Sequence, residues 1–331
     1  KYNTMMTALN KTEELYKSLY QRANEQKLSE SFSVPDEVIY DAAVPPNQPS
    51  KPQRGLLIVM ATLMALALYI MYLIVSTALD KTVNSISELK AKTGLDASGE
   101  FPQLPQANSA KLTFQNLLYA DMIHSLRLAL LGQNNHGGMI LVTSAQADAG
   151  SSLIAEMLAW SAAKSGKTLL IDVDYLASDG LSARYPQHKT GFSERLDGRS
   201  AAPQAVVPLA DTLDFMPRGE LSDSALLLFT SERLPALLTT LRQTYDYLII
   251  NAPSLGLAQD ALLLAPHVDI TLLAINAGEQ ASRIRDAQNR LQTAAPTPVA
   301  TMLNRVQEEN LETQEGKRLP ERGMGELISP K

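Results

Sequence analysis

The sequence predicts an α/β fold in which helices cover both faces of a parallel sheet, preceded by a helix that can cross a membrane. From residue 111 onward, short apolar runs alternate with segments of helical length. Apolar runs without polar alternation are typical of strands buried on both faces, as in parallel sheets. Upstream, residues 55–79 form an uncharged apolar run, long enough to span the ~30 Å hydrocarbon core of a bilayer.

The composition excludes several classes of protein. The chain has 331 residues, a formal net charge of −6 and no cysteine. A sequence pI of about 5.4 argues against a nucleic-acid binder, whose domain is usually basic. The lack of cysteine excludes disulfides, thiolate metal sites, iron–sulfur clusters and a cysteine nucleophile. The four histidines are widely scattered, so a histidine-based zinc site is not expected.

The apolar run at 55–79 favours a membrane span over a buried core helix or a signal peptide, because it is long, uncharged and begins far from the N-terminus. Basic residues flank both ends, so charge bias does not orient the span. Residues 1–32 predict a helix, either solvated and amphipathic or the arm of an antiparallel helical pair. Residues 33–44 predict a short strand, which a proline-rich extended segment follows.

Residues 80–110 are polar with scattered Gly and Pro, and predict a linker. The α/β pattern begins after them. The predicted helices are 117–131, 151–164, 226–241 and 281–294, and the predicted strands are 139–143, 168–173, 247–250, 269–275 and 299–303. Ligands of such sheets bind at the carboxyl ends of the strands, so the informative residues are expected to follow each strand.

Small residues follow the first predicted strand and lead directly into a helix, as in a phosphate-binding P-loop. Gly150, Ser151 and Ser152 occupy the places of Gly-Lys-Ser/Thr, so the lysine is absent. Two further strand ends carry polar residues of the kind found in nucleotide sites. Asp172 and Asp174 follow the second strand of the α/β region, and Asn251 stands where a Walker B aspartate would be.

These motifs resemble the C-terminal part of bacterial tyrosine kinases fused to polysaccharide co-polymerases, the Wzc-like chain-length determinants of capsule and exopolysaccharide export. LLIDVD is similar to the family's second Walker motif. GFSERLDG at 191–198, the MPRG turn at 216–219 and LNRV at 303–306 follow in the family's order. No single motif is specific, but the ordered set covers nearly the whole chain.

The resemblance implies an inner-membrane protein that forms a homo-oligomeric ring. It implies as partners a polysaccharide polymerase and an outer-membrane export channel, with no nucleic acid. The implied organisation is a periplasmic segment at 1–54, a transmembrane helix at 55–79, a cytoplasmic linker at 80–110, a P-loop tyrosine-kinase-like domain at 111–307 and a polar tail at 308–331. Residues 80–331 are then cytoplasmic.

The sequence departs from the family pattern in several places. Ser151 replaces the lysine that meets the β- and γ-phosphates, and neutral Asn251 is a poorer partner for hydrated Mg²⁺. The family's arginine after the second Walker motif is missing. The ring-contact motif is only partly present, as Asp121, His124 and Arg127, and no tyrosine follows Tyr247.

Each remaining candidate has two interpretations. Ser152 and Asp172 are the candidate ligands of a weakly held Mg²⁺, or they cap a helix and a strand. Asp174 belongs either to the same metal and water site or to the loop after the strand. Asn304 matches a position where related ATPases contact adenine, but Asn is also common at strand ends. Asn251 is expected to be a structural hydrogen-bonding residue.

The favoured functional prediction is a structural and regulatory protein whose kinase-like domain is an inactive pseudokinase. Its degenerate nucleotide site would comprise Gly150, Ser151, Ser152, Asp172, Asp174, Asn251 and Asn304. No cofactor is expected, with at most weak binding of Mg·ATP. The first alternative is an active tyrosine autokinase or ATPase with a noncanonical site. The second alternative is a pseudokinase that still binds a nucleotide, which acts only as a conformational ligand.

Overall fold

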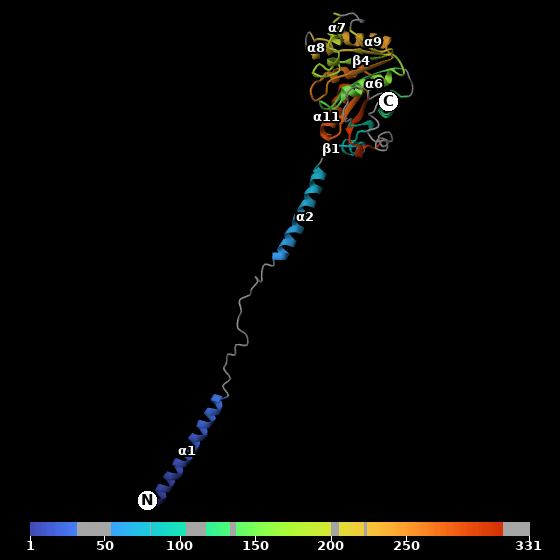
Figure 1. Cartoon of the computed structure of the whole chain (residues 1–331). Coiled ribbons are helices and arrows are strands. Elements are labelled where there is room, and N and C mark those ends of the chain that lie inside the picture. Colours follow the sequence, from blue (N-terminus) through green and yellow to red (C-terminus); the bar gives the residue numbers. More distant parts are fainter. Residues whose placement is uncertain are drawn as a thin grey trace. The chain divides into compact units, whose positions relative to one another are not determined.

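The computed structural model describes residues 1–31, 54–79, 81–103, 117–132, 137–199, 205–221 and 224–313. The chain forms two compact units, residues 1–78 and 79–331, which Figure 1 shows in colours that follow the sequence. The strand predicted at 33–44, the proline-rich segment after it and tail residues 314–331 lie outside the described residues.

The first unit contains two long helices, α1 (Tyr2–Ser31) and α2 (Arg54–Leu79). Every residue of α1 is exposed, including Leu15 and Leu19 on its apolar side. The stretch Gly55–Ser76 of α2 has a mean hydropathy of 2.5, and none of it is buried against the rest of the chain. This exposure argues against a buried core helix and fits the predicted membrane span.

The second unit is built on an eight-stranded sheet with the order β2-β10-β8-β3-β7-β4-β6-β5. All neighbouring strands are parallel except β5 and β6, so the predicted parallel sheet carries one antiparallel edge strand. The strands are β2 (Ala97–Pro102), β3 (Gly138–Ser144), β4 (Thr168–Asp172), β5 (Val207–Ala210), β6 (Leu213–Met216), β7 (Tyr247–Asn251), β8 (Ile270–Asn276) and β10 (Val299–Val306).

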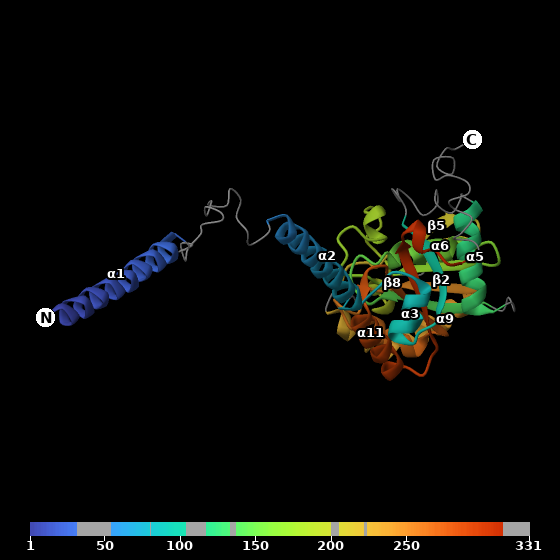
Figure 2. The ribbon, with the colours of Figure 1, turned by 90° about the horizontal axis from the view of Figure 1, so that it is seen from below.

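Helices cover both faces of this sheet, as predicted. The connection β3-α6-β4 runs across the sheet in the opposite direction to β7-α10-β8 and β8-α11-β10. Because such crossovers are right-handed, α6 lies on one face and α10 and α11 on the other. Helix α5 packs against α6 and beside edge strand β2 (Figure 2). The helices are α3 (Ile86–Thr93), α5 (Leu117–Leu131), α6 (Ser151–Ala162), α7 (Phe192–Leu196), α8 (Ala225–Phe229), α9 (Arg233–Thr244), α10 (Asp260–Leu264) and α11 (Ala281–Ala294), with 3₁₀ turns η1 (Ser182–Arg184), η3 (Ala265–His267) and η4 (Glu308–Asn310).

The central strands are buried on both faces, which is the reason their sequences are continuous apolar runs. Side chains of β3 and β7 such as Ile140, Leu141, Ile249 and Ile250 are 0% exposed. Neighbouring side chains along a strand point to opposite faces, so both faces of the sheet are covered. Because β3, β4, β7, β8 and β10 are parallel to one another, their carboxyl ends meet at one edge of the sheet, as predicted.

The prediction of a linker at 80–110 is wrong for residues 81–103. Short strand β1 (Thr82–Val83) pairs antiparallel with β9 (Glu279–Gln280), and α3 and β2 follow it. Three apolar side chains anchor the segment, namely Val83, Leu89 and Phe101, which are 0–2% exposed. The signal in the sequence is the pattern Ser-x-x-Glu at 85–88, where α3 begins. Ser85 accepts a hydrogen bond from the Glu88 amide, and the Glu88 carboxylate accepts one from Asn84.

The helix predicted at 226–241 is divided into α8 and α9. The break falls at 230–232, where the Ser231 hydroxyl accepts a hydrogen bond from the Arg233 amide. Pro235 lies in the first turn of α9, where its missing N–H leaves no helical hydrogen bond unmade. The same proline cannot continue a helix from the residues before it, so the chain starts a new one.

Candidate functional site

The loop after β3 enters helix α6 through a glycine whose conformation no other residue type adopts freely. Gly150 has φ +81°, and a Cβ at this position would lie 2.4 Å from Nδ2 of Asn304. Gly150 is also the N-cap of α6 and offers no side-chain acceptor to the first turn. The first amides of a helix lack intrahelical acceptors, and with the helix dipole they form a site suited to an anion.

A cavity of about 740 Å³ lies at this end of α6, within the range of ~300–1,000 Å³ typical of small-ligand pockets. Among the described residues, Asp148 and Arg305 are the two non-glycine residues with positive φ, at 60° and 56°, and both line this cavity. Backbone strain of this kind collects at functional sites. Five predicted site residues also line it: Gly150, Ser151, Ser152, Asp174 and Asn304.

The other two predicted site residues, Asp172 and Asn251, lie behind the cavity wall and contact each other. Both are 0% exposed and stand side by side in neighbouring strands. Nδ2 of Asn251 donates to Oδ1 of Asp172 at 2.8 Å, as expected for a structural role. The Asp172 carboxylate also accepts from the Asp174 amide and from the amide and hydroxyl of Ser182. A metal ion at Asp172 would have to displace these donors, so magnesium binding there stays a prediction.

Asp174 borders the cavity from the loop after β4. Its Oδ1 accepts hydrogen bonds from the amides of Leu176 and Ala177, at 3.0 and 3.1 Å. Burial raises the pKa of Asp174 above its ordinary value, and the charge of Asp172 raises it further. The two backbone hydrogen bonds and Arg218 oppose this rise. No group of three His, Cys, Asp or Glu side chains within the described ranges is placed to hold a metal ion.

Asn304 links strand β10 to the loop between β3 and α6. Its Nδ2 donates to the carbonyl oxygen of Ala149 at 2.7 Å, and its own carbonyl accepts from the Ala277 amide. The side chain is therefore used in holding the loop next to Gly150. Contact between Asn304 and an adenine base stays a prediction.

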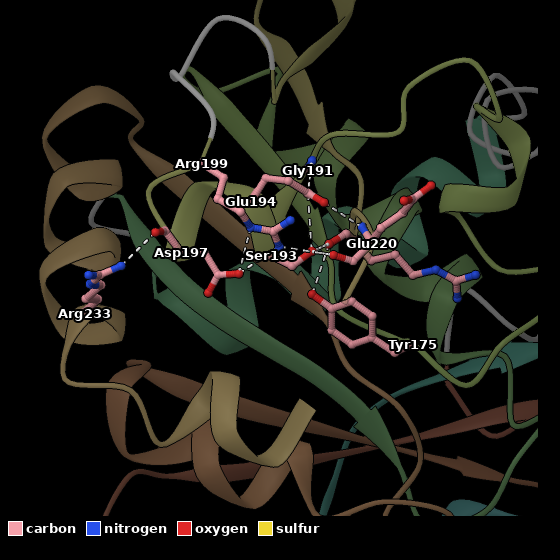
Figure 3. Close-up of polar contacts among 9 residues, drawn as sticks. Tyr175, Gly191, Ser193, Glu194, Asp197, Arg199, Glu220 and Arg233 are labelled. Atoms are coloured by element: carbon pink, nitrogen blue, oxygen red, sulfur yellow. Dashed lines mark hydrogen bonds and ion pairs between the residues drawn. The ribbon is translucent and has the colours of Figure 1, made fainter. Parts of the chain in front are cut away.

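A buried carboxylate, Glu194, fixes the turn that faces the loop after β4 (Figure 3). Its Oε2 accepts from the Gly191 amide at 2.8 Å, and its Oε1 accepts from the Glu220 amide at 2.9 Å. Gly219 has φ +78°, and a Cβ there would lie 2.0 Å from Oε2 of Glu194. Ser193 donates to the same turn from the adjacent position. The motifs GFSERLDG and MPRG thus form one packed unit.

Arg218 connects this unit to the cavity wall. Its Nη1 donates to the carbonyl oxygens of Asp174 and Ala177, at 2.6 and 2.7 Å. Its amide donates to the Ser182 hydroxyl, and its carbonyl accepts from the Tyr175 hydroxyl at 3.0 Å. Arg218 therefore sets the path of residues 174–182, which form one side of the cavity.

Reasoning from the sequence missed Arg184, Arg305 and Asp148 as cavity residues. Arg184 lies on η1, far along the chain from the phosphate-binding loop, and no spacing rule connects the two. Asp148 stands within the loop, but its left-handed conformation leaves no trace in composition. The motif MPRG did signal the turn that contains Arg218, although not its contacts.

The partial ring-contact motif lies on α5. Nδ1 of His124 is 2.7 Å from the Ser161 hydroxyl on α6, and burial lowers the pKa of His124. Arg127 is only 8% exposed, so it does not lie on an exposed face of the helix. His124 is therefore used within the chain.

Comparisons with known proteins place this geometry among bacterial tyrosine kinases. A family model described as "G-rich domain on putative tyrosine kinase" matches residues 5–78. The tyrosine-protein kinase CpsD of Streptococcus pneumoniae is 30% identical over 172 residues, which are 51% of this chain and 76% of CpsD. A putative tyrosine-protein kinase in the cps region of Klebsiella pneumoniae is 21% identical over 318 residues, which cover 88% of this chain and 44% of that protein.

Among solved structures, the kinase domain of Escherichia coli ETK superposes with a TM-score of 0.61 at 22% identity. The match covers 68% of this chain and 94% of that domain, and it supports the fold alone. The chain spans about three-quarters of CpsD but less than half of the Klebsiella relative.

Fold and relatives together define a protein of the bacterial tyrosine-kinase type, with a P-loop-like fold built on a parallel sheet. The chain belongs to the bacterial tyrosine-kinase family, and corresponds to the C-terminal region of a Wzc-like polysaccharide co-polymerase. The expectation of a pseudokinase is overturned by these relatives, because they are named tyrosine kinases. The loss of Lys and Asp in the motifs is not sufficient evidence of inactivity.

Proposed function

We propose that this chain is a membrane-anchored tyrosine kinase that acts in capsule or exopolysaccharide biosynthesis and export, with a noncanonical Mg·ATP site. The cavity at the uncapped N-terminus of α6 carries this proposal, since it presents backbone amides to a phosphate-sized anion in a chain of kinase ancestry. Bound ATP supplies the γ-phosphoryl group, and the acceptor is a tyrosine hydroxyl.

The residues around the cavity fit Mg·ATP in kind. The loop at 148–152 and the first turn of α6 offer backbone N–H groups to phosphate oxygens. The Ser152 hydroxyl and the Asp174 carboxylate both line the cavity, and oxygen ligands are those that Mg²⁺ prefers. Asn304 fixes the loop from the side of β10, which keeps the amides in place before the ligand arrives.

The same proposal sets the membrane topology. ATP is a cytoplasmic metabolite, so the unit that holds the cavity, residues 80–331, lies in the cytoplasm. Because α2 is a single candidate span among the described residues, it then crosses the inner membrane, and residues 1–54 lie in the periplasm. The exposed apolar residues of α1 need a cover, which we assign to other copies of the chain in a homo-oligomer and to the polysaccharide export machinery.

The test is phosphotyrosine formation by the full chain in detergent, with radiolabelled ATP and Mg²⁺. We expect incorporation of label into tyrosine, and its loss in the variant Ser152→Ala if the hydroxyl contributes to the Mg²⁺ site. Ser165→Ala, beyond the end of α6, serves as the control. Absence of both labelled tyrosine and calorimetric Mg·ATP binding in the unchanged chain would refute the proposal.

A further inference from the structure

The cavity contains positive charge even though Ser151 replaces the expected lysine. Two of its lining residues are cationic, Arg184 and Arg305. Three are aspartates, namely Asp148, Asp174 and Asp179, so a triphosphate entering the cavity meets an acidic wall that cations must offset. The two arginines differ in how they are held relative to the first amides of α6.

The backbone of Arg184 is fixed close to the carboxyl ends of the central strands. Its 3₁₀ turn begins at Ser182, whose amide and hydroxyl donate to Oδ2 of Asp172 at 2.9 and 2.6 Å. The Ser182 hydroxyl also accepts from the Arg218 amide at 2.9 Å. Through Arg218, the turn is tied to the Glu194 unit of Figure 3. Arg184 therefore projects from a rigid support rather than from a free loop.

The guanidinium of Arg184 lies against the phosphate-binding helix. Its Nη1 contacts Oε2 of Glu156 at 2.5 Å, and Glu156 stands one helical turn after Ser152 on α6. The Glu156 side chain is 10% exposed, whereas that of Arg184 is 44% exposed. A guanidinium has five N–H donors in a planar fork, so donors remain available on the cavity side.

We propose that Arg184 supplies the cation that contacts the β- and γ-phosphates, in place of the missing P-loop lysine, and that Glu156 holds it in position. This inference rests on the proposed nucleotide site. Arginine suits the role because its fork binds phosphate oxygens in a bidentate manner. Arg305 lacks a comparable tie to α6 among the described contacts. Arg242, which forms an ion pair with Asp269 outside the cavity, provides a control of equal charge and equal side-chain exposure, 44%.

The test is calorimetric titration of the full chain in detergent with Mg·ATP and, separately, with AMP. We expect Arg184→Ala to weaken Mg·ATP binding by about 10- to 150-fold, the range for a lost charge-assisted contact. AMP lacks the β- and γ-phosphates, so its affinity is expected to change by less than about 2-fold. We expect Arg242→Ala to leave Mg·ATP binding within about 3-fold of the unchanged chain, because its ion pair with Asp269 is exposed and lies outside the cavity.

Two further variants separate a ligand contact from a structural effect. The double variant Ser151→Lys/Arg184→Ala is expected to recover Mg·ATP affinity, because the lysine restores a cation at the loop. Glu156→Gln keeps an oxygen acceptor that can hold the guanidinium in position, and it removes the charge that competes with phosphate, so it is expected to tighten Mg·ATP binding. A purely structural ion pair would instead make Arg184→Ala and Glu156→Gln lose ATP and AMP binding alike.

The outcomes distinguish this inference from the proposed function. Mg·ATP binding that persists unchanged in Arg184→Ala refutes the role of Arg184 and leaves the kinase proposal standing. Equal losses for ATP and AMP also refute it. Absence of Mg·ATP binding by the unchanged chain refutes both.

Discussion

Compared with the family pattern, Ser151 removes a positive charge from the site and Asn251 removes a negative one, so the net charge of the pair is unchanged. A lysine and an aspartate at these positions would contribute one positive and one negative charge, and the present pair contributes none. The amide of Asn251 donates directly to buried Asp172, a contact that a carboxylate cannot make. The neutral asparagine therefore gives the buried Asp172 side chain a hydrogen-bond donor without a bound cation.

This pairing predicts that Asn251→Asp destabilises the chain. Two carboxylates at hydrogen-bond distance in a buried site cannot both ionise, and an uncompensated buried charge costs about 3–5 kcal/mol. The folded pair would hold a proton that the unfolded chain releases, so stability should fall as pH rises above the ordinary Asp pKa of about 3.9. Unfolding followed by Trp160 fluorescence from pH 4 to 8 measures this.

Asn289→Asp, at an exposed position of α11, is the control for Asn251→Asp. We expect its stability to follow that of the unchanged chain across the same pH range. If Asn251→Asp has the same pH dependence as this control, Asp172 is not held by the amide of Asn251 in the way that the structure indicates.

Asp174 predicts a second pH effect. Burial raises its pKa in the folded chain, so ionisation opposes folding as pH rises from the ordinary Asp value towards the raised one. Asp174→Asn keeps an oxygen acceptor for the two loop amides and removes the charge. We therefore expect the variant to melt at a higher temperature than the unchanged chain at pH 7, with the difference vanishing below about pH 3.8.

The same substitution has a consequence at Asp260, whose pKa is raised first by burial and then by the charge of Asp174. Removing that charge lowers the pKa of Asp260 and adds to the stabilisation at neutral pH. Differential scanning fluorimetry over pH 3–8 provides the comparison. A variant that melts below the unchanged chain at pH 7 would contradict the assignment.

Among the elements, strand β2 gives the clearest test of the structure, because its residues were predicted to lie in a linker. Phe101 is 2% exposed, and its ring centroid lies 5.5 Å from that of Tyr119 on α5. We expect Phe101→Ala to lower the free energy of unfolding by about 3–5 kcal/mol, measured by urea unfolding of the full chain in detergent. Truncation of a linker residue would change the free energy of unfolding by less than about 0.5 kcal/mol. Leu227→Ala, at an exposed position of α8, is the control for which we expect a change that small.

The elements that the sequence predicted share one property, namely a strong period or a continuous apolar run. Strands β3, β4, β7, β8 and β10 are of this kind, and so are α5, α6 and α11. Strands β2, β5 and β6 escaped prediction because each is interrupted by Gly, Pro, Asp or Glu, with the sequences ASGEFP, VPLA and LDFM. Such strands are stabilised by their neighbours in the sheet rather than by local pattern.

The site residues also fall into those that a sequence pattern predicts and those that it does not. Gly150, Ser152, Asp174 and Asn304 follow strand ends, so the rule for parallel sheets placed them at one edge. Arg184 reaches the cavity because Ser182 folds back onto Asp172, a contact between side chains that no periodicity encodes. The inactivity inferred from Ser151 is overturned by the relatives named as tyrosine kinases, and no motif marks Arg184, the replacement cation that we propose.

On the scale of the whole molecule, the proposed function requires the two ends of α2 to face different compartments. The chain has no cysteine, so a single introduced cysteine reports its own location. A maleimide that cannot cross the inner membrane should label Asn10→Cys on exposed α1 in intact cells. It should label Gln292→Cys on α11 only after lysis, because ATP and the cavity share the cytoplasm.

The unchanged chain, which carries no thiol, is the control for labelling of other groups. Labelling of both variants in intact cells would mean that α2 does not span the membrane. Labelling of Gln292→Cys alone would place the cavity away from ATP, and it would exclude the kinase role whatever the purified protein binds. The topology experiment therefore tests the function independently of the chemistry at Ser151, Arg184 and Asn251.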